Sequence, residues 1–222
     1  MTVIDTLRSA TLTLLQDTSN YVFSQAEVDT ALRQALLDYS NDCPRPAQIT
    51  LNAAGGSLLD LSAASGLLSL QKIHWRWDAA IDALEQESNR VQGWRFFLDS
   101  GSAQAQLLLS DGTPSYPQAG DAVRVEYEAA HTIAGLADEN GISPSVSSVP
   151  SAHLELLVRG AAGYAFLSGA ADRSDLLDRA LSERLGNAFL LRFHNQLERL
   201  GRGRNAMVTA LWRGMDKYET HP

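Results

Sequence analysis

Residues 24–46 read SQAEVDTALRQALLDYSNDCPRP and combine a helix start, an amphipathic helix and a helix stop. Ser24 followed three residues later by Glu27 is the capping-box pattern, in which each side chain bonds the backbone N–H of the other. Apolar residues then recur on one helical face, at Val28, Ala31, Leu32, Ala35, Leu36 and Tyr39. Pro44 and Pro46 end the helix because proline cannot continue it. The stretch predicts a helix followed by a change of secondary structure.

The sequence after Pro46 has the composition of short strands joined by turns. Brief apolar segments alternate with Gly, Ser, Asn and Asp. The segments that predict strands are 48–51, 57–61, 70–77, 93–98, 105–109 and 122–131. Two of them alternate strictly, with an apolar side at Ile73, Trp75, Trp77, Val123, Val125 and Tyr127 and a wet side at His74, Arg76, Asp78, Arg124, Glu126 and Glu128. This period of two predicts half-buried antiparallel strands.

Helical patterns flank the β-rich middle. An N-terminal helix is predicted from the spacing of Ile4, Leu7, Ala10, Thr11 and Leu14. Behind the middle, Pro150 and Ser151 open a helix whose Gly160–Gly163 segment would let another backbone approach closely. A further helix is predicted over 173–200, with a stripe at Leu177, Leu181, Leu185, Ala188, Arg192, Gln196 and Leu200. The stretch 201–204, Gly-Arg-Gly-Arg, is expected to break it, with Gly201 as its C-cap.

These patterns together predict an α+β fold, a helical bundle frame of N-terminal and C-terminal helices with an inserted antiparallel β-rich subdomain. The expected divisions are 1–46 for the N-terminal helices, 47–133 for the β-rich insertion, 134–148 for a loop, 149–200 for the C-terminal helices and 201–222 for a C-terminal tail.

Length and composition are those of a soluble globular chain. The 222 residues suit one compact domain or a domain with one large insertion. The longest apolar stretches fall far short of the roughly 20 residues that cross a bilayer, and residues 1–9 lack a secretory pattern. We therefore expect a protein made in the cytoplasm, with no membrane partner.

The net charge of −8 argues against a general nucleic-acid binder, which needs a basic surface. The charge is uneven along the chain. Residues 1–148 hold 8 Lys and Arg against 18 Asp and Glu, and residues 149–222 hold 10 against 8. An acidic N-terminal part and a mildly basic C-terminal part are suited to contacts with different partners.

Motifs for catalysis or cofactor binding fail in their context. Residues 201–206 fit a G-x-G-x-x-A dinucleotide pattern, but they follow a predicted helix instead of a strand. The five histidines form no H-E-x-x-H or i,i+4 pair, and the single cysteine, Cys43, cannot build a metal cage. Neither a G-x-S-x-G elbow nor a phosphate-binding loop is present. We expect no enzyme, no metal and no cofactor.

A small hydrolase or carbohydrate-binding module is the alternative from another class. Trp75 and Trp77 have the composition of a stacking platform, and Glu85 with Glu87 would supply paired carboxylates. Strand alternation favours core packing for the two tryptophans, and acidic residues beside a turn usually form a solvated face.

The C-terminal tail combines arginine with aromatic residues, which is the composition of interface anchors. A solvated, partly disordered tail is the competing interpretation. The predicted anchor residues are Arg202, Arg204, Trp212, Arg213, Met215 and Tyr218.

Three segments carry a family resemblance. They are the run Ala31–Ser40, the strand Val123–Tyr127 continued by Ala130–Ile133, and the Leu-x-x-Gly-Ala-Ala-x-Tyr helix of Leu157–Tyr164. Their order resembles the head-to-tail connector, or adaptor, proteins of tailed bacteriophages, and the likeness covers most of 25–200.

The resemblance implies a structural virion protein at the neck, the interface of head and tail. It implies a ring, expected to hold twelve copies, between the portal protein and a tail or nozzle protein. The ring would extend the channel crossed by double-stranded DNA without binding the DNA specifically. Family members commonly hold the portal through their C-terminal segment, which by position is 201–222 here. A tail terminator or completion protein is the alternative virion role.

Overall fold

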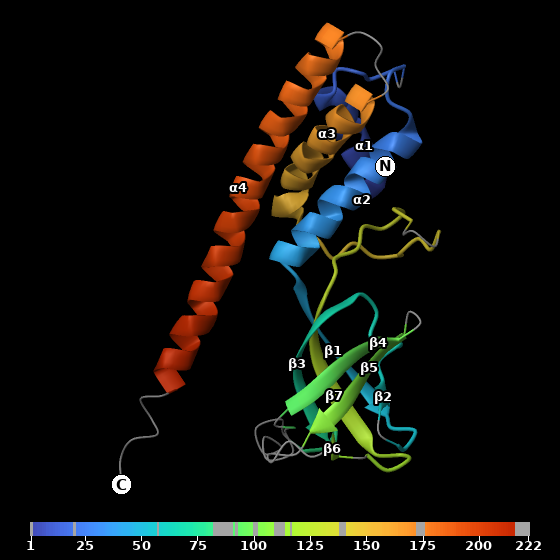
Figure 1. The fold of residues 1–222 in the computed structure, drawn as a ribbon, viewed down its shortest axis with the longest axis vertical. Coiled ribbons are helices and arrows are strands. Elements are labelled where there is room, and N and C mark those ends of the chain that lie inside the picture. Colours follow the sequence, from blue (N-terminus) through green and yellow to red (C-terminus); the bar gives the residue numbers. More distant parts are fainter. Residues whose placement is uncertain are drawn as a thin grey trace. The chain divides into compact units, whose positions relative to one another are not determined.

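A computed structural model describes residues 2–19, 21–56, 58–81, 91, 93–99, 102–108, 114–115, 117–137, 141–171 and 176–215. The chain forms two compact units (Figure 1). The helical unit comprises Met1–Cys43 and His131–Pro222, and the β unit comprises Pro44–Ala130. Helices and antiparallel sheets therefore lie in separate units, and the predicted α+β class is confirmed.

The helical unit places one helix between the others. Its helices are α1 (Val3–Leu14), α2 (Gln25–Asp42), α3 (Leu154–Ala171) and α4 (Leu176–Met215), with a 3-10 turn at Ser151–His153 before α3. α3 lies in the middle, with α4 along one side and α1 and α2 along the other (Figure 1). Fully buried side chains from three of these helices meet around α3, among them Leu32, Leu157 and Phe193.

Side-chain caps fix the starts of the first two helices. Ser24 N–H donates to Glu27 Oε2 over 2.7 Å, and Glu27 N–H donates to Ser24 Oγ over 3.3 Å. The predicted capping box of α2 is thereby confirmed. Hydrogen bonds from Ser24 also lower the pKa of the Glu27 carboxyl. Thr2 and Asp5 form the same arrangement at the start of α1.

The turn between α1 and α2 is organised around the carboxylate of Asp17. Its oxygens accept hydrogen bonds from the backbone N–H groups of Tyr21, Val22 and Phe23 at 2.8–2.9 Å. These bonds, the one from Phe23 foremost, hold the pKa of Asp17 below its ordinary value. The turn thus presents Phe23, which is 2% exposed, to the core.

Two glycines bring α3 and α4 into close contact. A Cβ atom at Gly163 would lie 2.8 Å from Leu190 Cγ and 3.2 Å from the Gly186 carbonyl oxygen. A Cβ atom at Gly186 would lie 3.0 Å from the Gly163 carbonyl oxygen. Since larger side chains would separate the helices, the close approach predicted for Gly160–Gly163 is confirmed.

The predicted end of the last helix at Leu200 is wrong. α4 continues through Gly201 and Gly203 to Met215. Each glycine costs a helix only about 1 kcal/mol relative to alanine, so two of them do not stop a helix whose other residues favour it. A Cβ atom at Gly201 would lie 3.4 Å from the Asp42 carbonyl oxygen, so a glycine suits the passage of α4 past the end of α2.

The predicted stripe of α4 is not its buried face. Ser182 is 2% exposed and Gly186 is buried, whereas Leu181 and Leu185 are 56% and 38% exposed. Small residues face α3 because the helices approach closely there, as the positions of Gly163 and Gly186 show. The face that packs on α3 is therefore rotated from the leucine stripe.

The β unit consists of two antiparallel sheets. Their strands are β1 (Arg45–Asn52), β2 (Leu59–Asp60), β3 (Leu67–Trp75), β4 (Gly93–Asp99), β5 (Ser102–Leu108), β6 (Pro114–Ser115) and β7 (Ala122–Ala129). One sheet has the order β1-β7-β3, and the other has β2-β5-β4 with β6 paired to β5. Side chains from both sheets, including Ile73, Ala105 and Val125, share one apolar core.

The alternation predicted for β7 is confirmed, because Val123, Val125 and Tyr127 are buried. In β3 the alternation stops at the strand end. Arg76 has a φ of 58°, in the left-handed region, and this reverses the side on which the next residue lies.

Trp77 consequently lies with residues of the predicted wet side, and its predicted place beside Ile73 is wrong. The Arg124 guanidinium lies 4.2 Å from the centre of the Trp77 ring, and the His74 ring lies 5.6 Å from it. His74, also predicted on the wet side, is only 3% exposed. Its Nδ1 has no hydrogen-bond partner in the part of the chain that the structure describes.

Candidate functional site

The predicted anchor lies C-terminal to the part of α4 that packs within the helical unit. Five of its residues lie on the C-terminal part of α4, where the backbone is helical and the side chains are outside the described residues. They are Arg202, Arg204, Trp212, Arg213 and Met215. Tyr218 lies outside the described residues altogether. The anchor therefore stays a prediction, with a helical backbone at its five described positions.

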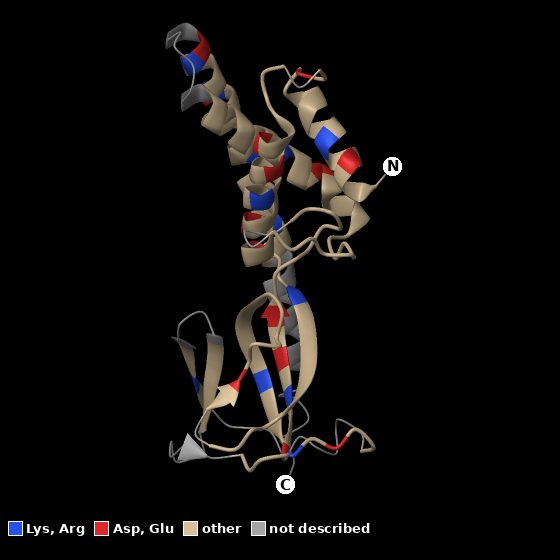
Figure 2. Ribbon diagram, turned by 90° about the vertical axis from the view of Figure 1, so that its right-hand side faces the viewer, with Lys and Arg blue, Asp and Glu red and all other residues tan. Residues whose placement is uncertain are grey.

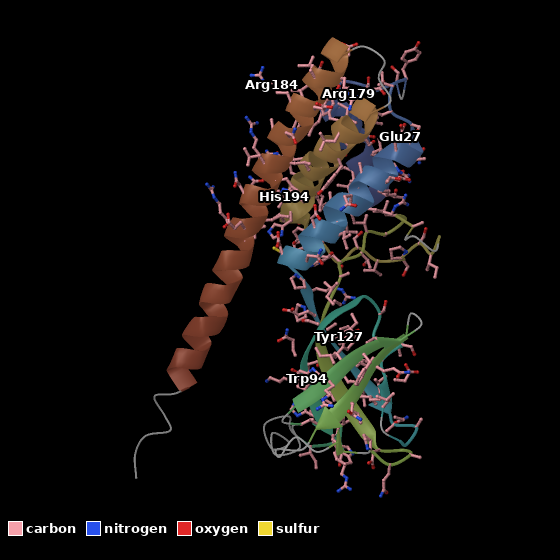
Figure 3. The ribbon with its side chains drawn as sticks, viewed as in Figure 1. Glu27, Trp94, Tyr127, Arg179, Arg184 and His194 are labelled. Atoms are coloured by element: carbon pink, nitrogen blue, oxygen red, sulfur yellow. The ribbon has the colours of Figure 1, made fainter. Side chains whose placement is uncertain are left out.

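The outer side of α4 exposes leucines together with arginines. Leu181, Leu185 and Leu191 are 56%, 38% and 64% exposed. Arg184 and Arg192 are exposed as well, and Figure 3 shows Arg184 pointing away from α3. Steps of three and four residues place these side chains on one side of the helix. This leucine–arginine face consists of Leu181, Arg184, Leu185, Ala188, Leu191 and Arg192.

Sequence reasoning found part of this face but gave it no function. It placed Leu181, Leu185, Ala188 and Arg192 on one stripe of the helix, and it left out Leu191. The same periodicity would have included Leu191, which lies three residues after Ala188. What the sequence does not show is that Ser182, Gly186, Phe193 and Leu197 form the buried face of α4, which leaves the leucines of the stripe outside.

A groove between the start of α3 and α4 is the second surface feature of the helical unit. Its volume is about 370 Å³, and its lining is Ala152, His153, Glu155, Leu156, Arg159, Gln196, Arg199 and Leu200. Glu155 and Arg159 are paired at 2.5 Å along α3. The groove therefore combines apolar walls with an ion pair and the further cation of Arg199.

Polar side chains bridge the elements beside this groove. The hydroxyl of Tyr39 lies 2.6 Å from His153 Nδ1, which ties α2 to the turn before α3. Burial raises the pKa of the Tyr39 hydroxyl to about 12. His131 Nε2 lies 2.9 Å from the Cys43 carbonyl oxygen, and His131 Nδ1 lies 3.0 Å from the Ser148 carbonyl oxygen. Both histidines therefore have structural partners. His131 also joins the start of the second chain segment of the helical unit to Cys43, the end of the first segment.

One carboxylate joins three helices. Tyr164 of α3 donates a hydrogen bond to Asp38 Oδ2 of α2, and His194 Nε2 of α4 lies 3.4 Å from the same oxygen. Burial, together with the bond to Asp38, raises the pKa of the Tyr164 hydroxyl. The trio therefore ties α2, α3 and α4 together through one carboxylate oxygen.

The alternative site built on tryptophans is not supported by the packing of their rings. Trp75 Nε1 donates to Asp121 Oδ2 over 2.8 Å, and the ring packs against the core of the β unit. The Trp77 ring is covered by Arg124. Both rings are therefore engaged within the unit, while Glu85 and Glu87 lie outside the described residues.

Among the described residues, His, Cys, Asp and Glu side chains form no group of three or more that would hold a metal ion. None of the helices described is long and apolar enough to span a membrane.

An exposed apolar and cationic helix face, in a unit whose polar clusters are used in packing, is typical of the class of proteins that bind other proteins. The family comparison makes this class specific. The model of the SU10 adaptor protein family matches residues 1–213, and the chain belongs to that family. It is a bacteriophage adaptor, a structural component of the virion. No significantly similar sequence was found among curated proteins.

Proposed function

We propose that this adaptor forms a ring at the neck of the virion, between the portal protein and a tail or nozzle protein. The observation that carries the proposal is the family match over residues 1–213. An adaptor joins other virion components, and a ring around the DNA path would join them without blocking the passage of the genome. Twelve copies are the expected number.

The leucine–arginine face of α4 supports self-assembly. Three leucines at 38–64% exposure lie on one side of a single helix, whereas scattered exposed leucines are the ordinary case. Apolar stripes of this kind pack against other helices. A second copy of the chain is an available partner at every position of a ring.

The C-terminal part of α4 is proposed to hold the portal. α4 has 40 residues and α3 has 18, so at 1.5 Å per residue the helices are roughly 60 Å and 27 Å long. α4 thus extends beyond the length that α3 can cover. The residues assigned to the contact are Arg202, Arg204, Trp212, Arg213, Met215 and Tyr218.

The acidity of the chain supports a channel that DNA crosses without specific binding. The net charge is −8 per chain, and a ring multiplies it. Repulsion between acidic side chains and phosphates keeps the genome from adhering to such a channel. In the view of Figure 2, acidic and basic residues lie next to one another along helices and strands, so the repulsion would come from the total charge more than from one patch.

Portal binding tests the assignment directly. The full chain and a variant carrying Trp212→Ala and Arg213→Ala are mixed with purified portal protein, and the dissociation constants are measured. We expect the double variant to bind at least about tenfold more weakly, because aromatic and arginine anchors dominate interfaces. Arg179→Ala is the matched control, since this exposed arginine on α4 already pairs with Glu183 at 3.0 Å. Equal affinity of all three proteins would refute the assigned anchor.

A further inference from the structure

We infer that the leucine–arginine face of α4 packs against the exposed side of α2 in a second copy of the chain. Each copy would then contact the next one through two different surfaces. The inference rests on the proposed ring and identifies the two surfaces that would close it. Its evidence is the exposure pattern of the two helices, their places around α3, and their opposite charges.

The surface on α4 is an apolar ridge within the leucine–arginine face. Leu181, Leu185 and Leu191 are 56%, 38% and 64% exposed, and Ala188 lies between them on the same side. Within the helical unit, α4 already packs on α3 through Phe193 and other buried residues. The ridge is therefore additional to the core contact and is free to bury its leucines against another helix.

The surface on α2 is its uncharged outer stripe. Its residues recur at helical spacing and are all exposed, namely Ala26, Thr30, Gln34, Leu37 and Asn41. Leu37 is 49% exposed and provides an apolar contact within the stripe. The short side chains of Ala26 and Thr30 in the same stripe leave room for leucines from a facing helix, as ridge-into-groove packing requires.

The two surfaces lie on opposite sides of α3. α4 packs along one side of that helix, and α2 with α1 packs along the other (Figure 1), while α2 and α4 meet only near Asp38 and His194 and near Asp42 and Gly201 among the described residues. A contact between different surfaces repeats from copy to copy, and it produces a ring when the rotation closes. A contact of α4 with α4 would instead stop at a dimer.

Charge favours the same pairing. α4 carries seven arginines against three acidic residues, a net charge of +4, of which +1 lies within 176–200, the part that carries the leucine–arginine face. α1 and α2 together carry five acidic residues against two arginines, a net charge of −3. Pairing α4 with α4 would bring Arg184 and Arg192 near their own copies, and like charges at an interface oppose binding.

Crosslinking of adaptor assembled on the portal protein tests the inference. In a Cys43→Ser background, Leu191→Cys and Leu37→Cys are introduced singly and together, and a short bismaleimide is added. Only the double variant should give a ladder of dimers, trimers and larger products. Dimers from Leu191→Cys alone would show contact of α4 with α4 and overturn the inference.

Electron microscopy of the same samples separates the two proposals. Rings without any ladder would overturn the assigned surfaces and leave the ring standing. The absence of rings would refute the ring, and the inference with it.

A second pair of variants tests the apolar ridge itself. Leu181→Glu with Leu185→Glu should weaken self-association at least about tenfold, because buried leucines at an interface would be replaced by charges. The melting temperature should be kept, since both side chains are exposed in the single chain. Leu68→Glu, at a β-unit leucine that is 39% exposed, is the matched control. Unchanged self-association in the double variant would contradict the inference.

Discussion

Gly163 and Gly186 set the distance between α3 and α4. Each lacks the side chain that would touch the opposite backbone, and Leu190 and Leu167 close around them. The helices can then approach until the backbone of one meets that of the other. This arrangement determines which side of α4 is buried, and so it determines that Leu181 and Leu185 face outward.

We expect Gly163→Ala to destabilise the helical unit by about 1–3 kcal/mol, because overpacking forces neighbours apart. The new Cβ would lie 2.8 Å from Leu190 Cγ. Urea unfolding followed by circular dichroism measures the loss. Ala180→Leu, which enlarges an exposed residue of α4, should change the free energy of unfolding little. Similar stability of Gly163→Ala and the unaltered chain would contradict the close crossing.

The raised pKa of Tyr39 predicts that the free energy of unfolding falls at alkaline pH. Burial raises its pKa to about 12, above the ordinary value of about 10. The folded state therefore resists ionisation of the phenol, and the associated stability is complete below pH 10 and is lost as the pH rises through 12. Tyr39→Phe should flatten this loss between pH 10 and 12, as measured by urea unfolding at each pH. Parallel pH profiles for the two proteins would rule out this role of Tyr39.

Local side-chain patterns were predictable where a few neighbouring residues are sufficient. The Ser24 and Glu27 cap needs only four consecutive residues, and the structure contains it. The position of Trp77 was not predictable, because it depends on the left-handed backbone of Arg76. The burial of His74 follows from contacts with Trp77, and strand alternation cannot reveal such contacts.

The helix α4 differs most from its sequence-based expectation. Glycines at 201 and 203 suggested an end, yet the helix runs from Leu176 to Met215. Helix propensity acts over many residues, and the stretch after Gly203 contains good helix formers such as Ala206, Met207 and Leu211. A continuous helix would carry the proposed portal anchor on a stiff support.

Ala206→Pro tests the continuity of α4. Proline in a helix interior removes a hydrogen bond and costs about 3 kcal/mol, so it should interrupt the helix near Arg202. Trypsin should then cut after Arg202 and Arg204 faster than in the unaltered chain, and portal binding should weaken. Ala206→Ser is the control that keeps the backbone donor. Equal cleavage rates in all three proteins would mean that the helix is already interrupted.

The strands were predictable in kind and less so in extent. The pattern of β7 gave both its position and its buried side. β3 begins at Leu67, three residues before the predicted start, and β2 is only two residues long. Pairing partners set these limits, because β3 pairs with β7 and β2 pairs with β5. Such pairings join segments far apart in the sequence, and periodicity alone does not specify them.

The whole molecule combines a helical unit with a separate β unit. Its class was predictable because helix and strand periodicities occupy different parts of the sequence. The surfaces proposed for assembly were only partly predictable, since exposure on α4 follows from its packing on α3. In the proposed ring, the helical unit supplies the contacts between copies and the C-terminal part of α4 contacts the portal.

A cryo-electron-microscopy map of the neck of the native virion tests this account most directly. We predict a closed ring of this chain, with twelve copies, in contact with the portal protein and around the DNA path. At each boundary between copies, α4 of one copy should face α2 of the next. Density for the chain elsewhere in the particle, or without a closed ring at the portal, would contradict the account.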